Sequence, residues 1–401
     1  MKIFADTIVL SIDKIRKDSC IEITDTSCLT TDLLIDKAIV YPAMINSHDH
    51  LVGNWYPPAI SEKKYVNSHL WVEDMKGHDT YKDRNKFWIN DGTFVFSTKK
   101  SQTLCNLGVY KNIFGGSTVV QDHAPNQDDS YYNSFPIKVL KEYRQCHSLP
   151  MGNWWGGKTA EEELELSRGK VPFIVHLGEG TDDITGSEFG DLISRDLLKE
   201  NTILIHGVAL KDNDIDVISK NGATVCWCPK SNENLLGAHM NIESCLKHGA
   251  RVVIGTDSTL SGSINLFKEL QFIKSTFPNI APQEVFKMVT SNAAEALKLP
   301  NSYGTLEHSQ GEMLILDSIN EDPFENLMQA DSINVKLLLH HNKPIFGDAE
   351  FLNSFAVNSS EYTLFDIDGR AKFVIGKPQD LVAYVNTFMD YTKTFPYIPI
   401  K

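Results

Sequence analysis

From residue 171 onward, short apolar runs alternate with segments of helical periodicity. Strands are expected at 171–176, 202–206, 223–228 and 251–257, and helices at 187–200, 212–220, 241–248, 263–276 and 282–298. Strands that alternate with helices at a period of about 25 residues are typical of βαβ units. This part of the chain is therefore predicted to form an α/β fold with a parallel sheet.

Side chains that bind metals or carry protons recur where these strands end. The strands end in His176, His206 and Asp257, and an earlier apolar run, Ala38–Ile45, leads through Pro42 toward His48 and His50. Alternate residues of a strand face the same way, so His48 and His50 form half of a metal site. A His-x-His pair alone is equally compatible with ordinary surface histidines. The later strand ends favour the metal site.

Ligands from the first and last strands must meet at one ion. Metal–ligand distances are roughly 2.0–2.2 Å, whereas the edges of an open eight-stranded sheet lie about 33 Å apart. Closing the sheet makes these strands neighbours and places the site at the C-terminal mouth. A (β/α)8 TIM-like barrel is therefore predicted. Its second strand is expected at 115–123, ending in His123, and its third and fourth strands are left unplaced.

The two ends of the chain have β-like patterns that flank this barrel. Residues 1–41 hold short apolar runs, too few to fold alone, and the tail has further runs near 313–316, 335–339 and 362–365 and an amphipathic helix at 378–391. Segments 1–41 and 305–401 are predicted to form one small composite β-sandwich domain, with the catalytic barrel at 42–304. The aromatic stretch from residue 51 to about 98 is expected to be a lid or pocket wall.

The composition of the chain limits the classes of partner that the protein can bind. The 401-residue chain has a formal net charge of -14, which argues against nucleic acid or an anionic membrane as the main partner. Its start lacks a signal-peptide core, and its seven cysteines, irregularly spaced, are typical of reduced thiols. We expect a cytoplasmic enzyme whose substrates are a small molecule and water. Both a monomer and a homo-oligomer are compatible with the sequence.

The residues at the strand ends suggest a chemistry. Three neutral imidazoles and one carboxylate around a divalent ion leave room for a water, whose pKa falls from 15.7 toward about 7. Glu179 follows His176 by three residues, and Gly178 and Gly180 permit the turn that aims it at this water. Glu179 is therefore predicted to be a general acid and base rather than a ligand.

Several sequence motifs follow one another along the chain. In order, they are PAMINSHDH, HLGEG, IHGVAL, CPKSNENLLG, GTDS, TSNAAEALKL and YGTLEHSQGEMLILD. Together they resemble the amidohydrolase superfamily, in the branch of cytosine and guanine deaminases and triazine chlorohydrolases. The resemblance implies a barrel with a composite β-sandwich and one zinc or iron. It implies the ligands His48, His50, His176 and Asp257, the catalytic residues Glu179, His206 and Asp257, and a pocket shaped by Ser231 and Asn232.

Some features depart from the family pattern. Asp49 stands where a small hydroxyl residue is usual, and the span between the second and fifth strands is short. No lysine lies at an assigned fourth-strand end; Lys158, in a glycine-rich loop, is the nearest, so one metal is expected rather than two. His123 and Trp155 are further candidates for substrate binding, with a structural role as the alternative for each.

The leading interpretation is metal-dependent hydrolytic deamination of an aminated heterocycle or nucleoside-like compound. The same site would also suit hydrolysis of a C–Cl bond or a cyclic amide C–N bond. The third hypothesis is a barrel scaffold without catalytic activity. The complete set of candidate ligands, together with Glu179 and His206, argues against this hypothesis.

Overall fold

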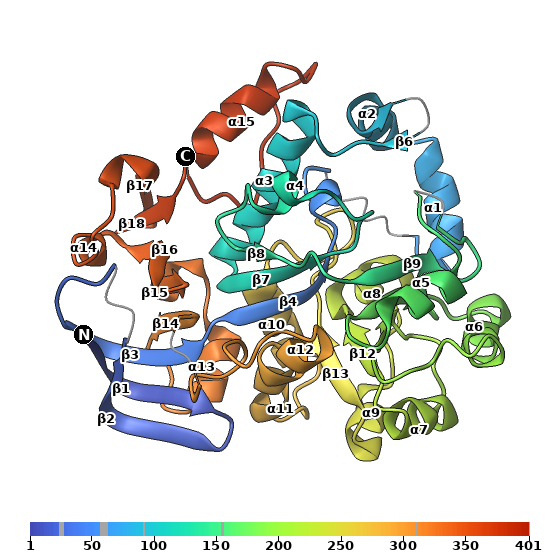
Figure 1. Ribbon diagram of the computed structural model, residues 1–401, viewed down its shortest axis with the longest axis horizontal. Helices are drawn as coiled ribbons and strands as arrows, with labels where there is room; N and C mark the ends of the chain where they lie inside the picture. Colours follow the sequence, from blue (N-terminus) through green and yellow to red (C-terminus); the bar gives the residue numbers. More distant parts are fainter. Residues whose placement is uncertain (24–27, 57–62, 91–92, 154–155, 309–310, 401) are drawn as a thin grey trace.

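The computed structural model describes residues 1–23, 28–56, 63–90, 93–153, 156–308 and 311–400. Two parallel sheets form the centre of this described chain (Figure 1), in the orders β4–β7–β8 and β13–β12–β11–β10–β9. Their strands are β4 (Met44–Asp49), β7 (Ser117–Asp122), β8 (Lys138–Val139), β9 (Arg144–Ser148), β10 (Phe173–Leu177), β11 (Thr202–His206), β12 (Thr224–Trp227) and β13 (Arg251–Ile254). The predicted α/β architecture with parallel strands is therefore present.

The segment that follows β13 binds the end of β4 through its backbone. The carbonyl of His48 accepts hydrogen bonds from the backbone N–H of Thr256 at 3.0 Å and of Asp257 at 3.1 Å. A Cβ at Gly255 would lie 2.5 Å from the Cβ of His48, so only glycine permits this close approach. The first and last strands of the central region thus meet at the residues that carry the predicted ligands.

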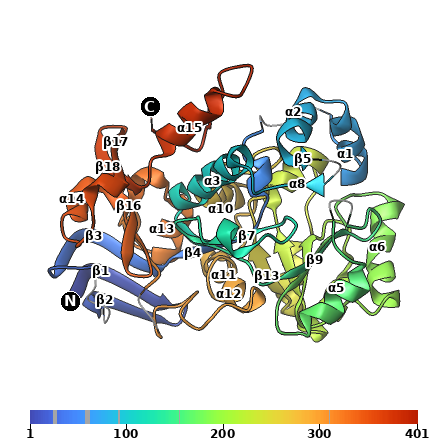
Figure 2. The same ribbon diagram turned by 45° about the horizontal axis from the view of Figure 1, so that its top comes forward.

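Helices cover the outer faces of these strands (Figures 1 and 2). They are α3 (Lys99–Phe114), α5 (Ala160–Ser167), α6 (Asp183–Ser194), α7 (Asp212–Lys220), α9 (Ile242–His248), α10 (Leu266–Thr276), α11 (Pro282–Met288) and α12 (Ser291–Ala296). α8 (Pro229–Leu236) instead lies at the C-terminal end of β12, beside the ends of the neighbouring strands. The single helix expected at 282–298 is two helices, because Thr290 leaves helical geometry at φ -131° and ψ -99°. The helix expected at 187–200 begins at Asp183, since the side chain of Asp182 caps it by accepting from the Thr185 N–H.

The third and fourth strands give no recognisable apolar run. β8 has only two residues, and β9, although as long as β10, has the largely polar sequence Arg-Gln-Cys-His-Ser.

Strands from both ends of the chain share one sheet, visible in Figure 1 as blue and red-orange arrows side by side. Its order is β17–β18–β16–β15–β14–β3–β1–β2. The strands are β1 (Lys2–Ser11), β2 (Lys14–Glu22), β3 (Leu33–Pro42), β14 (Met313–Asp317), β15 (Val335–His340), β16 (Lys343–Asp348), β17 (Tyr362–Ile367) and β18 (Arg370–Ile375). Residues of both chain ends, such as Ile35 and Phe373, pack in one cluster. The domain boundaries themselves stay a prediction.

The apolar run Ala38–Ile45 is divided between two sheets, although one strand leading into the histidines was expected. β3 ends at Pro42, opposite Met313 of β14, and β4 begins at Met44. The two strands belong to different sheets, and the N–H of Ala43, between them, donates to the carbonyl of Glu312 at 3.1 Å.

The remaining elements lie around these sheets. They are η1 (Leu51–Gly53), α1 (Ser68–Lys76), α2 (Asp79–Trp88), β5 (Ile89–Asn90), β6 (Thr93–Phe94), α4 (Asp129–Tyr132), α13 (Pro323–Gln329), η2 (Ser332–Asn334), α14 (Ala349–Leu352), η3 (Ser359–Glu361) and α15 (Pro378–Asn386). The tail helix is shorter than the predicted 378–391. Within the described chain, no helix has both the length and the apolar character needed to cross a membrane.

The shared sheet predicts a large cost for truncating a side chain where the two chain ends meet. Leu314 of β14 is fully buried opposite Tyr41 of β3, so Leu314→Ala should lower the free energy of unfolding by about 2–5 kcal/mol. Leu364→Ala, at a position 66% exposed, is the matched control and should change it by no more than about 0.5 kcal/mol. Urea denaturation followed by circular dichroism measures both, and equal midpoints would contradict the packing described here.

Candidate active site

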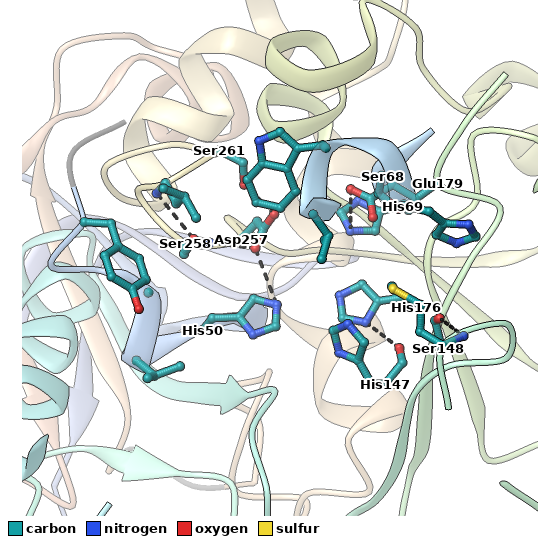
Figure 3. A pocket seen from close by; sticks show the side chains of 18 of the residues that line it. His50, Ser68, His69, His147, Ser148, His176, Glu179, Asp257, Ser258 and Ser261 are labelled. Atoms are coloured by element: carbon teal, nitrogen blue, oxygen red, sulfur yellow. Dashed lines mark hydrogen bonds and ion pairs between the residues drawn. The ribbon is translucent and has the colours of Figure 1, made fainter. Parts of the chain in front are cut away.

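The predicted ligands from the first and last strands lie together. His48 lies within β4, His50 directly follows it, and Asp257 lies just after β13. The Oδ1 atom of Asp257 is 3.6 Å from Nε2 of His50 (Figure 3) and 4.0 Å from Nε2 of His48. Two donor atoms that share an ion at roughly 2.0–2.2 Å lie no more than about 4.4 Å apart. The spacing therefore fits one shared ion.

His176 extends this group from β10. Single ring nitrogens of His48, His176 and His206 lie within 4.8 Å of one another. The Nδ1 of His176 is 2.8 Å from the carbonyl oxygen of His147, to which it donates, so its Nε2 is left for a metal.

The buried donor atoms are in the protonation state that a metal ion requires. Both ring nitrogens of His48 are buried, and neither forms a hydrogen bond of ordinary geometry with a described residue. Burial, and then repulsion from His50, lowers the pKa of His48, which keeps the ring neutral as a ligand must be. Burial raises the pKa of Asp257, but the nearby histidines, His50 foremost, outweigh it and hold that pKa below its ordinary value. This donor set fits a divalent ion.

Asp257 is oriented by neighbouring hydroxyl groups. Its Oδ2 accepts hydrogen bonds from Ser231 at 2.8 Å and from Ser261 at 2.7 Å. Its Oδ1, which accepts from the Ser258 N–H at 2.7 Å, is the oxygen nearest both histidines. The backbone of Asp257 is left-handed, with φ +52°, a strained conformation for a residue other than glycine.

Glu179 lies beside the same cluster, in the loop after β10. Gly178 has φ +63°, the left-handed conformation expected for the turn there. An Oε1 of Glu179 is 3.4 Å from Nε2 of His206. Burial, followed by repulsion from Asp257, raises the pKa of Glu179 to about 8. A carboxyl group with this pKa can both hold and release a proton near neutral pH.

His206 is held by a predicted pocket residue. Nδ2 of Asn232 donates to Nδ1 of His206 at 3.0 Å, so the ring proton lies on Nε2, toward Glu179. Ser231 and Asn232 are fully buried, and both contact site residues rather than line the cavity. His123, also fully buried, packs against His48 and His176 behind the lining. Trp155 lies outside the described residues.

A pocket opens over these groups, and several of its lining residues were not predicted. His147 and Ser148 reach it from the end of β9 and Glu188 from α6, whereas His69, on α1, belongs to the stretch that was expected to form the wall. Figure 3 labels His147, Ser148 and His69 around the pocket. Nε2 of His69 is 3.4 Å from Oε1 of Glu188, whose pKa burial raises to about 7. For His147 the available signal was a histidine near a strand end, but the polar sequence of β9, Arg-Gln-Cys-His-Ser, hid the strand.

The aromatic stretch after β4, which was expected to be a lid or pocket wall, forms much of the wall of this pocket. Tyr56 follows η1, Trp71 lies on α1, and Tyr81 and Arg84 lie on α2. The central carbon of the Arg84 guanidinium lies 4.0 Å from the centre of the Tyr81 ring. Flat aromatic walls of this kind suit a planar ring.

A second set of histidines consists of His123, His147 and His176. One ring nitrogen of each lies within 4.8 Å of those of the other two. This set shares His176, which has one ring nitrogen left, so His176 can serve only one ion. Lys158 is exposed, and the described strand β9 ends at Ser148 without a lysine.

Residues 164–333 match the sequence model of the amidohydrolase family. A 5-methylthioadenosine/S-adenosylhomocysteine deaminase of Thermococcus sibiricus is 30% identical over 160 residues, which are 36% of this chain and 37% of that protein. The chain thus spans little more than a third of this relative's length. The enzyme of the same name from Pyrococcus horikoshii is 22% identical over 333 residues, 71% of this chain and 76% of that protein.

Among solved structures, atrazine chlorohydrolase TrzN from Arthrobacter aurescens TC1, complexed with zinc, has a TM-score of 0.65 at 16% identity. The match covers 88% of this chain and 98% of that one, which shows the fold. The predicted resemblance is thereby confirmed: this chain is similar to the amidohydrolase family in sequence over residues 164–333, and its fold is of the TIM-barrel α/β type.

Proposed function

We propose that this protein is a metal-dependent hydrolase that removes an amino group from an aminated heterocycle or nucleoside-like compound. One observation carries the proposal: donor atoms of His48, His50, His176 and Asp257 gather beside Glu179 and His206 at one pocket. The names of the matched relatives, which are deaminases of adenosine derivatives, support the same reaction.

We further propose that the two parallel sheets close into one (β/α)8 barrel spanning residues 42–304. The hydrogen bonds from Thr256 and Asp257 to the carbonyl of His48 support closure at the seam between β13 and β4. Segments 1–41 and 305–401 then form the flanking composite β-sandwich, supported by the pairing of β3 with β14.

The metal would be held by His48, His50, His176 and Asp257. A divalent ion there, zinc or iron, supplies Lewis acidity that lowers the pKa of a water molecule beside it. Ser231 and Ser261 fix the Asp257 carboxylate, and the carbonyl of His147 fixes the ring of His176. Such supporting contacts orient ligands and tune the ion.

Proton transfer falls to Glu179. Its carboxylate takes the proton of the attacking water and later delivers it to the departing amine. The N–H of His206, which faces Glu179, donates to the attacking oxygen or to the ring. Tyr56, Trp71 and Tyr81 hold the planar ring against the wall and exclude water.

A second candidate keeps the site and changes the bond that breaks. Hydrolysis of a C–Cl bond is favoured by the fold match to a chlorohydrolase, and a cyclic amide C–N bond would use the same groups. Incubating the zinc-loaded protein with aminated purines, pyrimidines and triazines, and with chlorinated triazines, separates these reactions by the release of ammonia or chloride.

We expect about one metal ion per chain, bound through His48 among others. His48→Ala removes a ligand from the first strand, so the purified variant should retain little metal by elemental analysis. His239→Ala, a histidine outside the pocket that pairs with Glu233, is the matched control and should retain all of it. Full metal in His48→Ala, or two ions per wild-type chain, would refute this ligand set.

Glu179→Gln should lower kcat by about 10²–10⁴-fold, because glutamine keeps the size of the side chain but carries no proton. Metal content should stay unchanged, since Glu179 is not a ligand in this proposal. Both are measured on the substrate that the screen identifies. Loss of metal would make Glu179 a ligand, and a kcat within about threefold of wild type would remove its catalytic role.

A further inference from the structure

A buried ion pair lies behind the candidate ligands, on the side away from the pocket. Nζ of Lys111, from α3, is 3.1 Å from Oδ1 of Asp49, and both side chains are fully buried. Asp49 stands between His48 and His50 on β4, so its side chain points to the opposite face. A buried charge is costly without a partner, which makes the two residues depend on each other.

The ammonium group of Lys111 uses all of its three donors. Besides Asp49, it donates to Oδ1 of Asn54 at 3.0 Å and to the backbone carbonyl of Asp257 at 2.5 Å. One group therefore bonds both to the strand that carries His48 and His50 and to the backbone of the carboxylate ligand.

Amide side chains complete the network around Asp49. Its Oδ1 accepts from Asn54 at 2.9 Å and its Oδ2 from Asn112 at 3.0 Å. Nδ2 of Asn46 donates to Oδ1 of Asn112 at 2.8 Å and to the hydroxyl oxygen of Thr256 at 2.9 Å, which links these two residues. The network spans β4, α3 and the segment after β13, so it bears on the distance between the His48–His50 pair and Asp257.

We infer that Lys111 is a positioning residue for the metal centre of the proposed function: it locks the His48–His50 pair and Asp257 at a fixed separation before the ion binds. The left-handed backbone of Asp257, at φ +52°, needs a fixed partner, and the ammonium supplies one at its carbonyl. Asp49 is fully buried, and Lys111 supplies the compensating charge that a buried carboxylate requires.

The test replaces the pair with neutral groups of similar size, as Asp49→Asn/Lys111→Met, which leaves no buried charge unpaired. Zinc affinity is measured by competition with a chromophoric chelator, and the ligand geometry by the visible absorption of the cobalt(II) form. We expect affinity to fall by about 10–100-fold, the usual effect of losing a group that orients ligands, with a changed cobalt spectrum. Asn54→Ala keeps both charges but removes one hydrogen-bond partner from Asp49 and one from Lys111, so its zinc affinity should fall by less.

A second buried lysine provides the control. Lys372 is equally buried, lies 2.7 Å from Asp348 and donates to two backbone carbonyls, in the sheet of the chain ends. Lys372→Met should lower Tm but leave zinc affinity and the cobalt spectrum unchanged.

Affinity within about threefold of wild type and an unaltered spectrum in the double variant, or in Asn54→Ala if the double variant does not fold, would overturn the role of Lys111. A wild-type protein that binds no zinc would instead refute the proposed metal site.

Discussion

The meeting of β4 with the segment after β13 is the constraint on which the site depends. The carbonyl of His48 accepts from two successive backbone amides, at 3.0 and 3.1 Å, and glycine at position 255 lets the backbones approach. Residues far apart in the sequence are thereby held within the few ångströms that a metal ion requires. The buried Lys111–Asp49 pair reinforces the same junction from behind.

The parts of this arrangement that follow local rules could be predicted from the sequence. β10, β11 and β13 are regular apolar strands followed by helices; His176 and His206 lie at the C-terminal ends of β10 and β11, and Asp257 lies three residues after β13 ends. Parallel strands present these ends at one edge, so His176, His206 and Asp257 could be grouped without knowing any contact. The turn at Gly178 and the side chain of Glu179 followed from the same reasoning.

Other parts depend on contacts that no local pattern encodes. β8 has two residues and β9 is largely polar, so neither shows an apolar strand pattern and His147 was not placed. Glu188 reaches the pocket from helix α6, where a single polar residue resembles any solvated one. Lys111 lies on α3, which is buried on nearly every side, so its partner is apparent only in the folded chain.

The position of the ion tests this account most directly. Anomalous diffraction at the zinc edge, from crystals of the zinc-loaded protein, locates it without reference to activity. The account predicts one peak, within roughly 2.0–2.2 Å of donor atoms of His48, His50, His176 and Asp257. A peak among His123, His147 and His176 instead, or two peaks per chain, would contradict it.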